Sequence, residues 1–235
     1  MVKFFFILNV FLSFSGAIFS QVNESDSFTK LKFCGYKFRD TGLLRKQYQQ
    51  QLNFLQLKDG DTVVDVGTGS GSFIGALNVI AEIKQAHFIL VDIDSNCLTP
   101  YKVNDMIRYY ELLHGTKFNN TFSMVLNNSD SLYLPLNRFR KILLLNTLHE
   151  IDDKFKMAKQ LAAVLQPGGD LIIGEMSPMG KNITHQGCHK PLMSIDEITG
   201  LFARFGFKPT GIENVQPVVK EKVKHPYNFI RLTKM

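Results

Sequence analysis

Residues 62–71 read TVVDVGTGSG, a β-branched run that passes directly into three spaced glycines. The run from Thr62 to Val66 predicts a strand, because β-branched side chains pack well on a buried, pleated surface. Glycine reaches positive φ angles and lets the backbone approach a ligand closely. Small and apolar residues at helical spacing follow from Phe73 to Ile83. The stretch therefore predicts a strand, a glycine loop and a helix, which together form the first unit of an α/β fold.

The alternation of strands and helices continues on both sides of this stretch. Further strands are predicted at residues 87–91, 122–126, 142–145, 171–174, 207–215 and 227–232, and further helices at 40–57, 97–113, 154–165 and 194–205. Gly115 is expected to close the third helix, and Gln166-Pro167-Gly168-Gly169 to stop the fourth. Continuous apolar strands between helices are typical of a parallel sheet that is covered on both faces.

The composition is that of an ordinary globular chain. It has 235 residues, of which 45% are hydrophobic and 20% charged, and this excludes collagen, coiled-coil arrays and full disorder. The net charge of +6 is mild, and the C-terminal lysines have Glu221 among them and no interleaved aromatic residues. We therefore expect no nucleic-acid partner. Cys34, Cys97 and Cys188 allow at most one disulfide and a leftover thiol.

Residues 1–20 differ in composition from the rest and read MVKFFFILNVFLSFSGAIFS. One lysine, an apolar run and small residues near a possible cleavage point predict a secretory signal peptide. An uncleaved membrane anchor is the alternative, and the lysines that follow the run would then favour a cytoplasmic C-terminal side. We expect the chain to be exported or membrane-anchored through this segment, with possible membrane association and an open topology.

Carboxylates stand at the ends of the first two strands. In an open parallel sheet, ligands bind beyond the carboxyl ends of the strands. Asp65 precedes the glycine loop, and Asp92 lies about 20 residues beyond it, which is the separation expected of a carboxylate that binds ribose hydroxyls. Ser72 stands where a third glycine would complete the dinucleotide fingerprint, so that fingerprint fits poorly.

From about Asp40 to its end, the chain resembles the class I S-adenosylmethionine-dependent methyltransferases, whose first motif is similar to residues 63–71. The resemblance implies a seven-stranded, mostly parallel, doubly wound, Rossmann-like sheet with an antiparallel last strand. We therefore expect three segments: the signal or anchor at 1–20, an extension with a helix at 21–57, and a single methyltransferase domain at 58–235. S-adenosylmethionine is the cofactor that the resemblance implies.

The resemblance also assigns roles to residues around the cofactor. Asp65 would orient the ammonium group and Asp92 the ribose, while Asp94 is expected to cap the next helix. The other residues expected at the cofactor are Gly67, Thr68, Gly69, Gly71, Ile93 on the adenine face, Asp130 and Ser131 on the adenine edge, and Asn146.

Residues 146–153, NTLHEIDD, follow the fourth strand and are similar to the Leu-His-Asp-type motif of small-molecule O-methyltransferases. In that motif the histidine is the general base, a role that suits an imidazole because it titrates near neutrality. The match assigns this role to His149 and makes Glu150 its acidic neighbour. A His149 that only lines the end of the sheet is an equal alternative. The chain lacks the Asn/Asp-Pro-Pro-aromatic motif of enzymes that methylate exocyclic amines of bases or glutamine.

His185, Cys188 and His189 offer metal-binding atoms within one short loop. They lack partners at structural-zinc spacing, so we expect no metal and a loop that covers the substrate. Taken together, these patterns predict methyl transfer to a small molecule, with an oxygen acceptor slightly favoured. An exported, non-catalytic binding protein that keeps the fold is the alternative, and an NAD-dependent dehydrogenase is a weaker one.

Overall fold

The computed structural model describes residues 28, 30–129, 131–180, 183–215 and 226–235. The predicted leader at 1–20, Asp130 and the lysines between 220 and 224 lie outside these residues. Within the described part, strands form one seven-stranded sheet in the order β3-β2-β1-β4-β5-β7-β6. The strands are β1 (Thr62–Val66), β2 (His87–Asp92), β3 (Thr121–Leu126), β4 (Phe139–Leu145), β5 (Leu165–Met176), β6 (Phe207–Val215) and β7 (Tyr227–Lys234).

The pairing of the strands confirms the predicted Rossmann-like sheet. β1 pairs in parallel with β2 and β4, and the parallel set extends to β3 and β5. β7 runs antiparallel between β5 and β6, so the expected antiparallel last strand is present. The strand order reverses between β1 and β4, which both lie in the middle of the sheet. This point, at the carboxyl ends of the strands, is where such sheets bind ligands.

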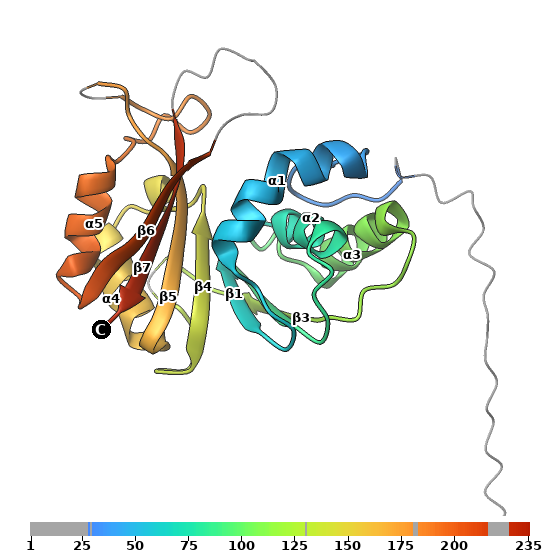
Figure 1. Cartoon of the computed structure of the whole chain (residues 1–235), viewed down its shortest axis with the longest axis horizontal. Coiled ribbons are helices and arrows are strands. Elements are labelled where there is room, and N and C mark those ends of the chain that lie inside the picture. Colours follow the sequence, from blue (N-terminus) through green and yellow to red (C-terminus); the bar gives the residue numbers. More distant parts are fainter. Residues whose placement is uncertain (1–27, 29, 130, 181–182, 216–225) are drawn as a thin grey trace, which may run out of the picture.

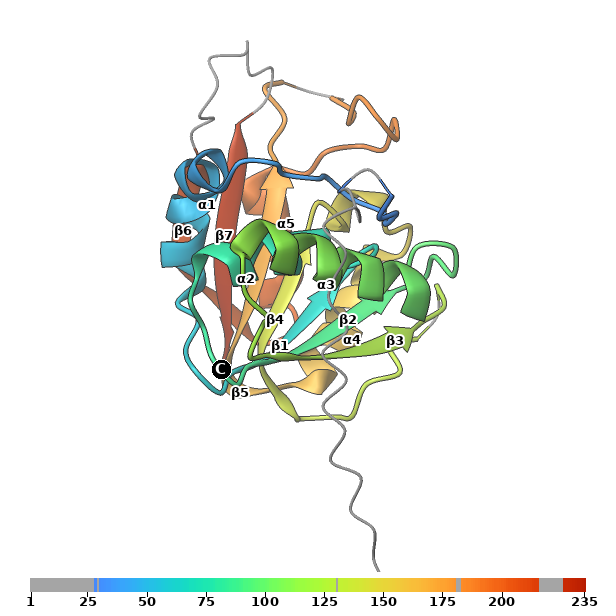
Figure 2. The same ribbon diagram turned by 90° about the vertical axis from the view of Figure 1, so that its right-hand side faces the viewer.

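Helices cover the sheet in two groups. α1 (Thr41–Leu55), α2 (Ser72–Ile80) and α3 (Pro100–His114) lie together on one face, and α4 (Lys154–Val164) and α5 (Ile195–Ala203) lie on the other (Figures 1 and 2). Their ends follow the local signals, since Gly115 ends α3 in a left-handed conformation and Ser194 forms a capping box with Glu197 at α5. In the described residues, no helix has the length and hydropathy needed to cross a membrane.

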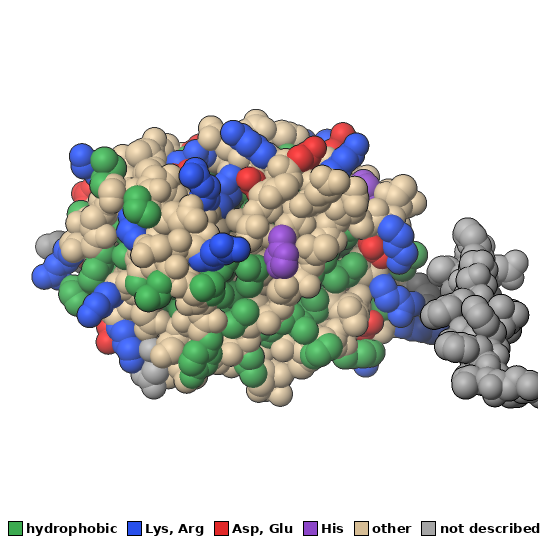
Figure 3. Space-filling view, turned by 90° about the horizontal axis from the view of Figure 1, so that it is seen from below, with side chains coloured by type: hydrophobic (Ala, Val, Ile, Leu, Met, Phe, Trp, Pro, Cys, Tyr) green, Lys and Arg blue, Asp and Glu red, His purple; other side chains and the backbone are tan. Residues whose placement is uncertain are grey.

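Two details of the sheet differ from the predictions. β5 already begins at Leu165, so Pro167, Gly168 and Gly169 lie inside the strand and not between a helix and a strand. A register shift between Phe139 and Lys141 of β4 accommodates them. The second face is also not fully covered, because the described part of the link at 127–138 contains no helix. Figure 3 shows hydrophobic side chains gathered across the lower face of the molecule.

The segment before α1 belongs to the same core as the first three helices. Leu31, Phe33 and Phe38 are buried against the apolar sides of α1, α2 and α3. Tyr109 of α3 anchors this segment, because its hydroxyl donates to the carbonyl oxygen of Phe38 at 2.6 Å. A disulfide between Cys34 and Cys97 ties the segment to the turn that precedes α3. The chain before α1 therefore passes over the start of α2, beside the glycine loop.

Candidate functional site

The glycine loop between β1 and α2 takes up the backbone conformation that its sequence predicts. Gly67, Gly69 and Gly71 all have positive φ angles, at 77°, 61° and 84°. A Cβ at Gly67 would lie 2.2 Å from Oγ1 of Thr147, in the segment after β4. Only glycine therefore allows the two loops at the centre of the sheet to approach this closely. Gly71 stands at the N-cap of α2, so the N-terminal end of this helix lies at the loop.

Asp65 is buried near the carboxyl end of β1, two residues before the first glycine of this loop. Its Oδ2 accepts a hydrogen bond of 2.6 Å from the Thr68 hydroxyl. Burial raises the pKa of Asp65 to about 7, and the nearby Asp92 carboxylate adds to the rise, while the Thr68 hydrogen bond opposes it. A buried carboxylate with one hydrogen-bond donor is well suited to a cationic ligand, which would stabilise its charged form.

Asp92 ends β2 and holds the glycine loop from the side. Its Oδ2 accepts from the backbone N–H of Gly69 at 2.6 Å, and its Oδ1 accepts from that of Asp94 at 2.8 Å. Ile93 is exposed, so its side chain is free to pack against a flat ring. Asp94 does not cap a helix as predicted. Thr99 caps α3, and Asp94 instead closes a turn by accepting from the N–H of Asn96.

The segment after β3 supplies the edge of this region. Asn128 Oδ1 accepts from the N–H of Ser131, and the two residues form an isolated bridge. Asn127 is buried, and its Oδ1 accepts from the N–H of Tyr133 at 3.1 Å. Ser131 therefore lies in a polar turn at the carboxyl end of β3, as expected, while its neighbour Asp130 lies outside the described residues.

Ser70 was not among the predicted residues, yet it connects the glycine loop to the disulfide. Its buried hydroxyl accepts from the N–H of Cys34 at 2.9 Å and donates to the carbonyl oxygen of Cys97 at 2.8 Å. Ser70 thus contacts both halves of the cross-link. The sequence signal was weak, because a serine between two glycines fits any tight turn.

His149 lies at the carboxyl end of β4, in a short 3₁₀ helix from Leu148 to Glu150. It is only 3% exposed, and its Nδ1 lies 2.7 Å from Oε2 of Glu175. An ionised carboxylate can only accept, so this contact places a proton on Nδ1 and leaves Nε2 as the other ring nitrogen, directed away from Glu175. The predicted acidic neighbour, Glu150, is largely exposed and places Oε1 3.8 Å from Nε2. The orienting carboxylate is therefore Glu175, at the end of β5.

Three residues connect the His149 region with the glycine loop. Asn146 directly follows β4 with a positive φ of 51°, and its N–H donates to the carbonyl oxygen of Gly174. Thr147 contacts Gly67, as described above. Tyr227 is half-buried, and desolvation first and then the carboxylates of Glu175 and Asp65 raise its pKa well above the ordinary value. These contacts make the two sets of predicted residues one continuous site.

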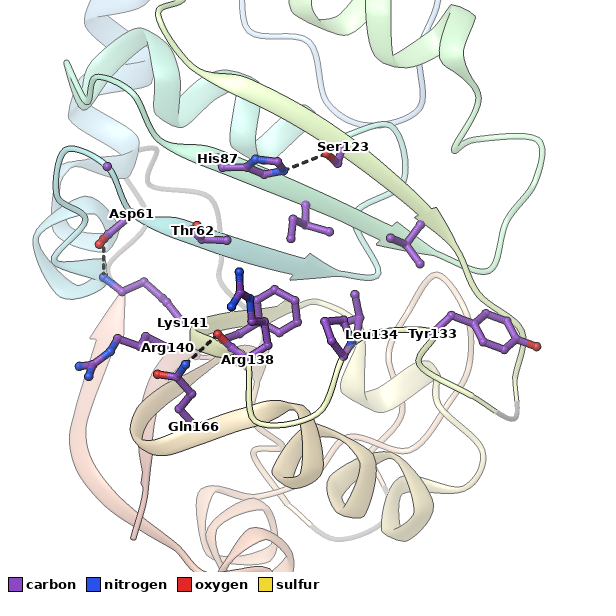
Figure 4. A pocket seen from close by; sticks show the side chains of 15 residues that line it. Asp61, Thr62, His87, Ser123, Tyr133, Leu134, Arg138, Arg140, Lys141 and Gln166 are labelled. Atoms are coloured by element: carbon purple, nitrogen blue, oxygen red, sulfur yellow. Dashed lines mark hydrogen bonds and ion pairs between the residues drawn. The ribbon is translucent and has the colours of Figure 1, made fainter.

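A hollow of about 680 Å³ lies elsewhere, where the sheet face has no helix. It contains none of the predicted site residues. Figure 4 shows side chains from the starts of β1 and β4, among them Asp61 and Lys141, around its rim. Inside it, Nε2 of His87 on β2 lies 2.8 Å from the Ser123 hydroxyl on β3. The hollow faces away from the carboxyl ends of the strands, so we place the functional site at the glycine loop.

Residues 41–211 match the family model described as a methyltransferase domain. The chain belongs to this family. The match runs from α1 into β6 and includes the glycine loop, Asp92 and His149. The predicted resemblance to class I methyltransferases is confirmed, and the family supports S-adenosylmethionine as the cofactor. No curated protein sequence matches the chain.

Several solved structures share the fold. An S-adenosylmethionine-dependent methyltransferase from Aquifex aeolicus is 19% identical with a TM-score of 0.57, and the match covers 84% of this chain and 100% of the other. A methyltransferase from Haloferax volcanii, in complex with the activator Trm112, is 15% identical with a TM-score of 0.57, over 84% and 94%. An N-methyltransferase from Haemonchus contortus, in complex with phosphomonomethylethanolamine and S-adenosylhomocysteine, is 16% identical with a TM-score of 0.60, over 85% and 55%. At these identities the likeness shows the fold.

Proposed function

We propose that the protein transfers a methyl group from S-adenosylmethionine to a small-molecule acceptor, with an oxygen acceptor favoured. The observation that carries this proposal is the pair of carboxylates, Asp65 and Asp92, on the two sides of a glycine loop beside His149. The residues fit the cofactor, because Asp65 is buried and suited to an ammonium group, while each Asp92 oxygen accepts one backbone N–H and keeps a further lone pair for a ribose hydroxyl. When bound, the cofactor supplies an electrophilic methyl group on a sulfonium sulfur.

On the acceptor side, the chain offers His149. Glu175 holds the imidazole in one orientation, and the Nε2 lone pair can take the proton of a hydroxyl. Burial of the pair excludes water, and alignment of donor and acceptor supplies much of the rate of a displacement at carbon. We propose His149 as the group that acts on the acceptor and Glu175 as its positioning residue. Glu150, at the exposed rim, is the second acidic group near Nε2.

Replacing Asp92 by alanine should weaken the binding of S-adenosylmethionine about 10- to 150-fold, since charged hydrogen bonds contribute about 1.5 to 3 kcal/mol. The matched control is Asp94→Ala, which removes a neighbouring carboxylate whose hydrogen bond only closes a turn. Isothermal titration of both variants gives the two dissociation constants. Equal constants for the two variants would contradict the role of Asp92.

Binding of the cofactor should also weaken below pH 7. The pKa of Asp65 lies at about 7, so its carboxyl is ionised above this pH and protonated below it. A cationic ligand favours the ionised form, and the proton must leave before it binds, which costs up to about tenfold in affinity for each pH unit. Titrations between about pH 5.5 and 8.5 should show a falling acid limb that Asp65→Asn removes. A wild-type affinity that does not change over this range would contradict the prediction.

The alternative functions make different predictions for the same samples. A non-catalytic binding protein would bind S-adenosylmethionine but release no S-adenosylhomocysteine with any acceptor. A dehydrogenase would bind NAD instead, and titration with NAD tests this directly. The intact pair Asp65 and Asp92 favours the methyltransferase.

We further propose that the chain is exported or membrane-anchored through residues 1–20. The Cys34–Cys97 disulfide supports this proposal, because such bonds persist mainly in oxidising compartments. Mass spectrometry of protein from its native host should find a mature start near Ile18 or Gln21, or the whole chain in the membrane fraction. Full-length protein in the cytosolic fraction would contradict it.

A further inference from the structure

The loop after β5 brings two potential metal ligands close to the buried Nε2 of His149. Ligand atoms of His149, His185 and Cys188 all lie within 4.8 Å of one another. The rings of His149 and His185 have their centroids 4.6 Å apart, and Nδ1 of His185 lies 3.3 Å from Sγ of Cys188. In a tetrahedral zinc site with bonds of about 2.0 to 2.3 Å, neighbouring ligand atoms lie about 3.3 to 3.6 Å apart. The His185–Cys188 pair already has this spacing, and the wider separations, up to 4.8 Å, would close by roughly 1 Å when an ion binds.

The strongest sign of a ligand is the free nitrogen of His149. Nε2 is buried, and it has no hydrogen-bond partner among the residues that the structure describes. A buried polar atom without a partner costs about 1 to 3 kcal/mol, so a native fold keeps it only where something compensates. The other ring nitrogen is bonded to Glu175 at 2.7 Å. Histidines that bind metals have this arrangement, with a carboxylate that fixes the tautomer and directs the other nitrogen at the ion.

The loop that carries the other two ligands is held in place by its own contacts. Thr184 and Pro191 form a β-bridge across it, and the N–H of His185 donates to the carbonyl oxygen of Lys190 at 2.8 Å. Lys190 in turn forms an ion pair of 2.6 Å with Asp152, just after the 3₁₀ helix that holds His149. This ion pair at the surface joins the loop to the segment that carries His149.

We propose that His149, His185 and Cys188 bind a divalent transition metal ion, with zinc as the ion that fits best. Two imidazoles and a thiolate are ligands that zinc accepts, whereas magnesium and calcium prefer oxygen. Three protein ligands leave a further position, as in catalytic zinc sites. The carboxylate of Glu150, with Oε1 3.8 Å from Nε2, is near enough to add negative charge. The proposal goes beyond the proposed function and does not depend on bound cofactor, but it uses the same Nε2 that the proposed function directs at the acceptor.

The metal changes what His149 does to the acceptor. An Nε2 bound to an ion cannot take a proton, so the metal and the general-base roles exclude each other in one molecule. Metal content therefore decides which of the two roles the purified enzyme uses.

The test uses the full chain, freed of metal by a chelator and handled under nitrogen. Titration with Zn²⁺ should show one ion per chain, and Co²⁺ should give a thiolate-to-cobalt charge-transfer band. Loss of a group that only orients a ligand typically weakens metal binding by about 10- to 100-fold, so Cys188→Ser and His185→Gln, which remove ligands, should weaken zinc binding by more than this. Cys188→Ser should also abolish the cobalt band. His189→Gln, from the same loop, is the matched control and should bind as the wild type does.

Two results would overturn the proposal. One is a wild-type chain that binds no zinc, and the other is Cys188→Ser and His185→Gln variants that bind it as tightly as the wild type. Both variants lie in a surface loop, and circular dichroism checks that they fold. S-adenosylmethionine is titrated into the same samples. Zinc binding without cofactor binding contradicts only the proposed function, and cofactor binding without zinc binding contradicts only the metal site.

Discussion

Replacing Cys34 and Cys97 together by serine is expected to lower the free energy of unfolding by about 4 kcal/mol. The disulfide joins residues that are 63 positions apart, and closing a loop of this length removes much of the conformational entropy of the unfolded chain. A loss of this size is a large fraction of the total free energy of unfolding of a single domain. Urea unfolding of the oxidised wild type and of the double variant measures the difference.

Loss of the Cys34–Cys97 disulfide should also affect the cofactor site. Cys34 and Cys97 both contact the hydroxyl of Ser70 in the glycine loop, so the cross-link holds the N-terminal segment beside the cofactor residues. Cofactor affinity should therefore fall together with stability. Reduction of the wild type should reproduce the double variant, while Cys188→Ser should change the unfolding free energy of the metal-free chain by no more than about 0.5 kcal/mol. A loss below 1 kcal/mol in the double variant would contradict this account.

Features encoded by neighbouring residues could be predicted from the sequence. The glycine loop, the end of α3 at Gly115 and the capping box at Ser194 all depend on contacts within a few residues, and the structure has each where it was expected. The sheet could be predicted because buried parallel strands are continuously apolar. The start of β5 at Leu165 was missed because Pro-Gly-Gly favours a turn, and these residues form an irregular stretch between the β4 pairings of Leu165 and Asp170.

Features that depend on distant residues could not be predicted. Glu175 stands 26 residues after His149, and its only local sign is one acidic residue at the end of an apolar strand. His149 meets His185 and Cys188 only because the loop after β5 folds back across the end of β4. Three cysteines allow three pairings, and the path of the N-terminal segment decides among them. In each case the partner is set by topology and not by spacing in the sequence.

His149→Gln is expected to lower methyl transfer by about 10²- to 10⁴-fold, the contribution of a well-placed proton acceptor. The glutamine amide can still donate to Oε2 of Glu175, so the buried carboxylate keeps a partner and the fold should survive. Cofactor affinity should stay within about twofold, because Asp65, Asp92 and the glycine loop are unchanged. The measurement is the release of S-adenosylhomocysteine with an identified acceptor, together with a titration of S-adenosylmethionine.

His114→Gln is the matched control, since His114 is exposed at the end of α3, where its Nδ1 lies 2.8 Å from the Thr116 hydroxyl and its ring lies near Phe118. It should turn over as the wild type does. Glu175→Gln keeps a group of the same size beside Nδ1 but removes the charge that fixes the tautomer, so it should lower activity by about 10- to 100-fold. If His149→Gln keeps full activity, His149 only lines the end of the sheet, and the enzyme works by aligning donor and acceptor. If the loss appears only in zinc-loaded protein, the lone pair of Nε2 serves the metal and not the proton.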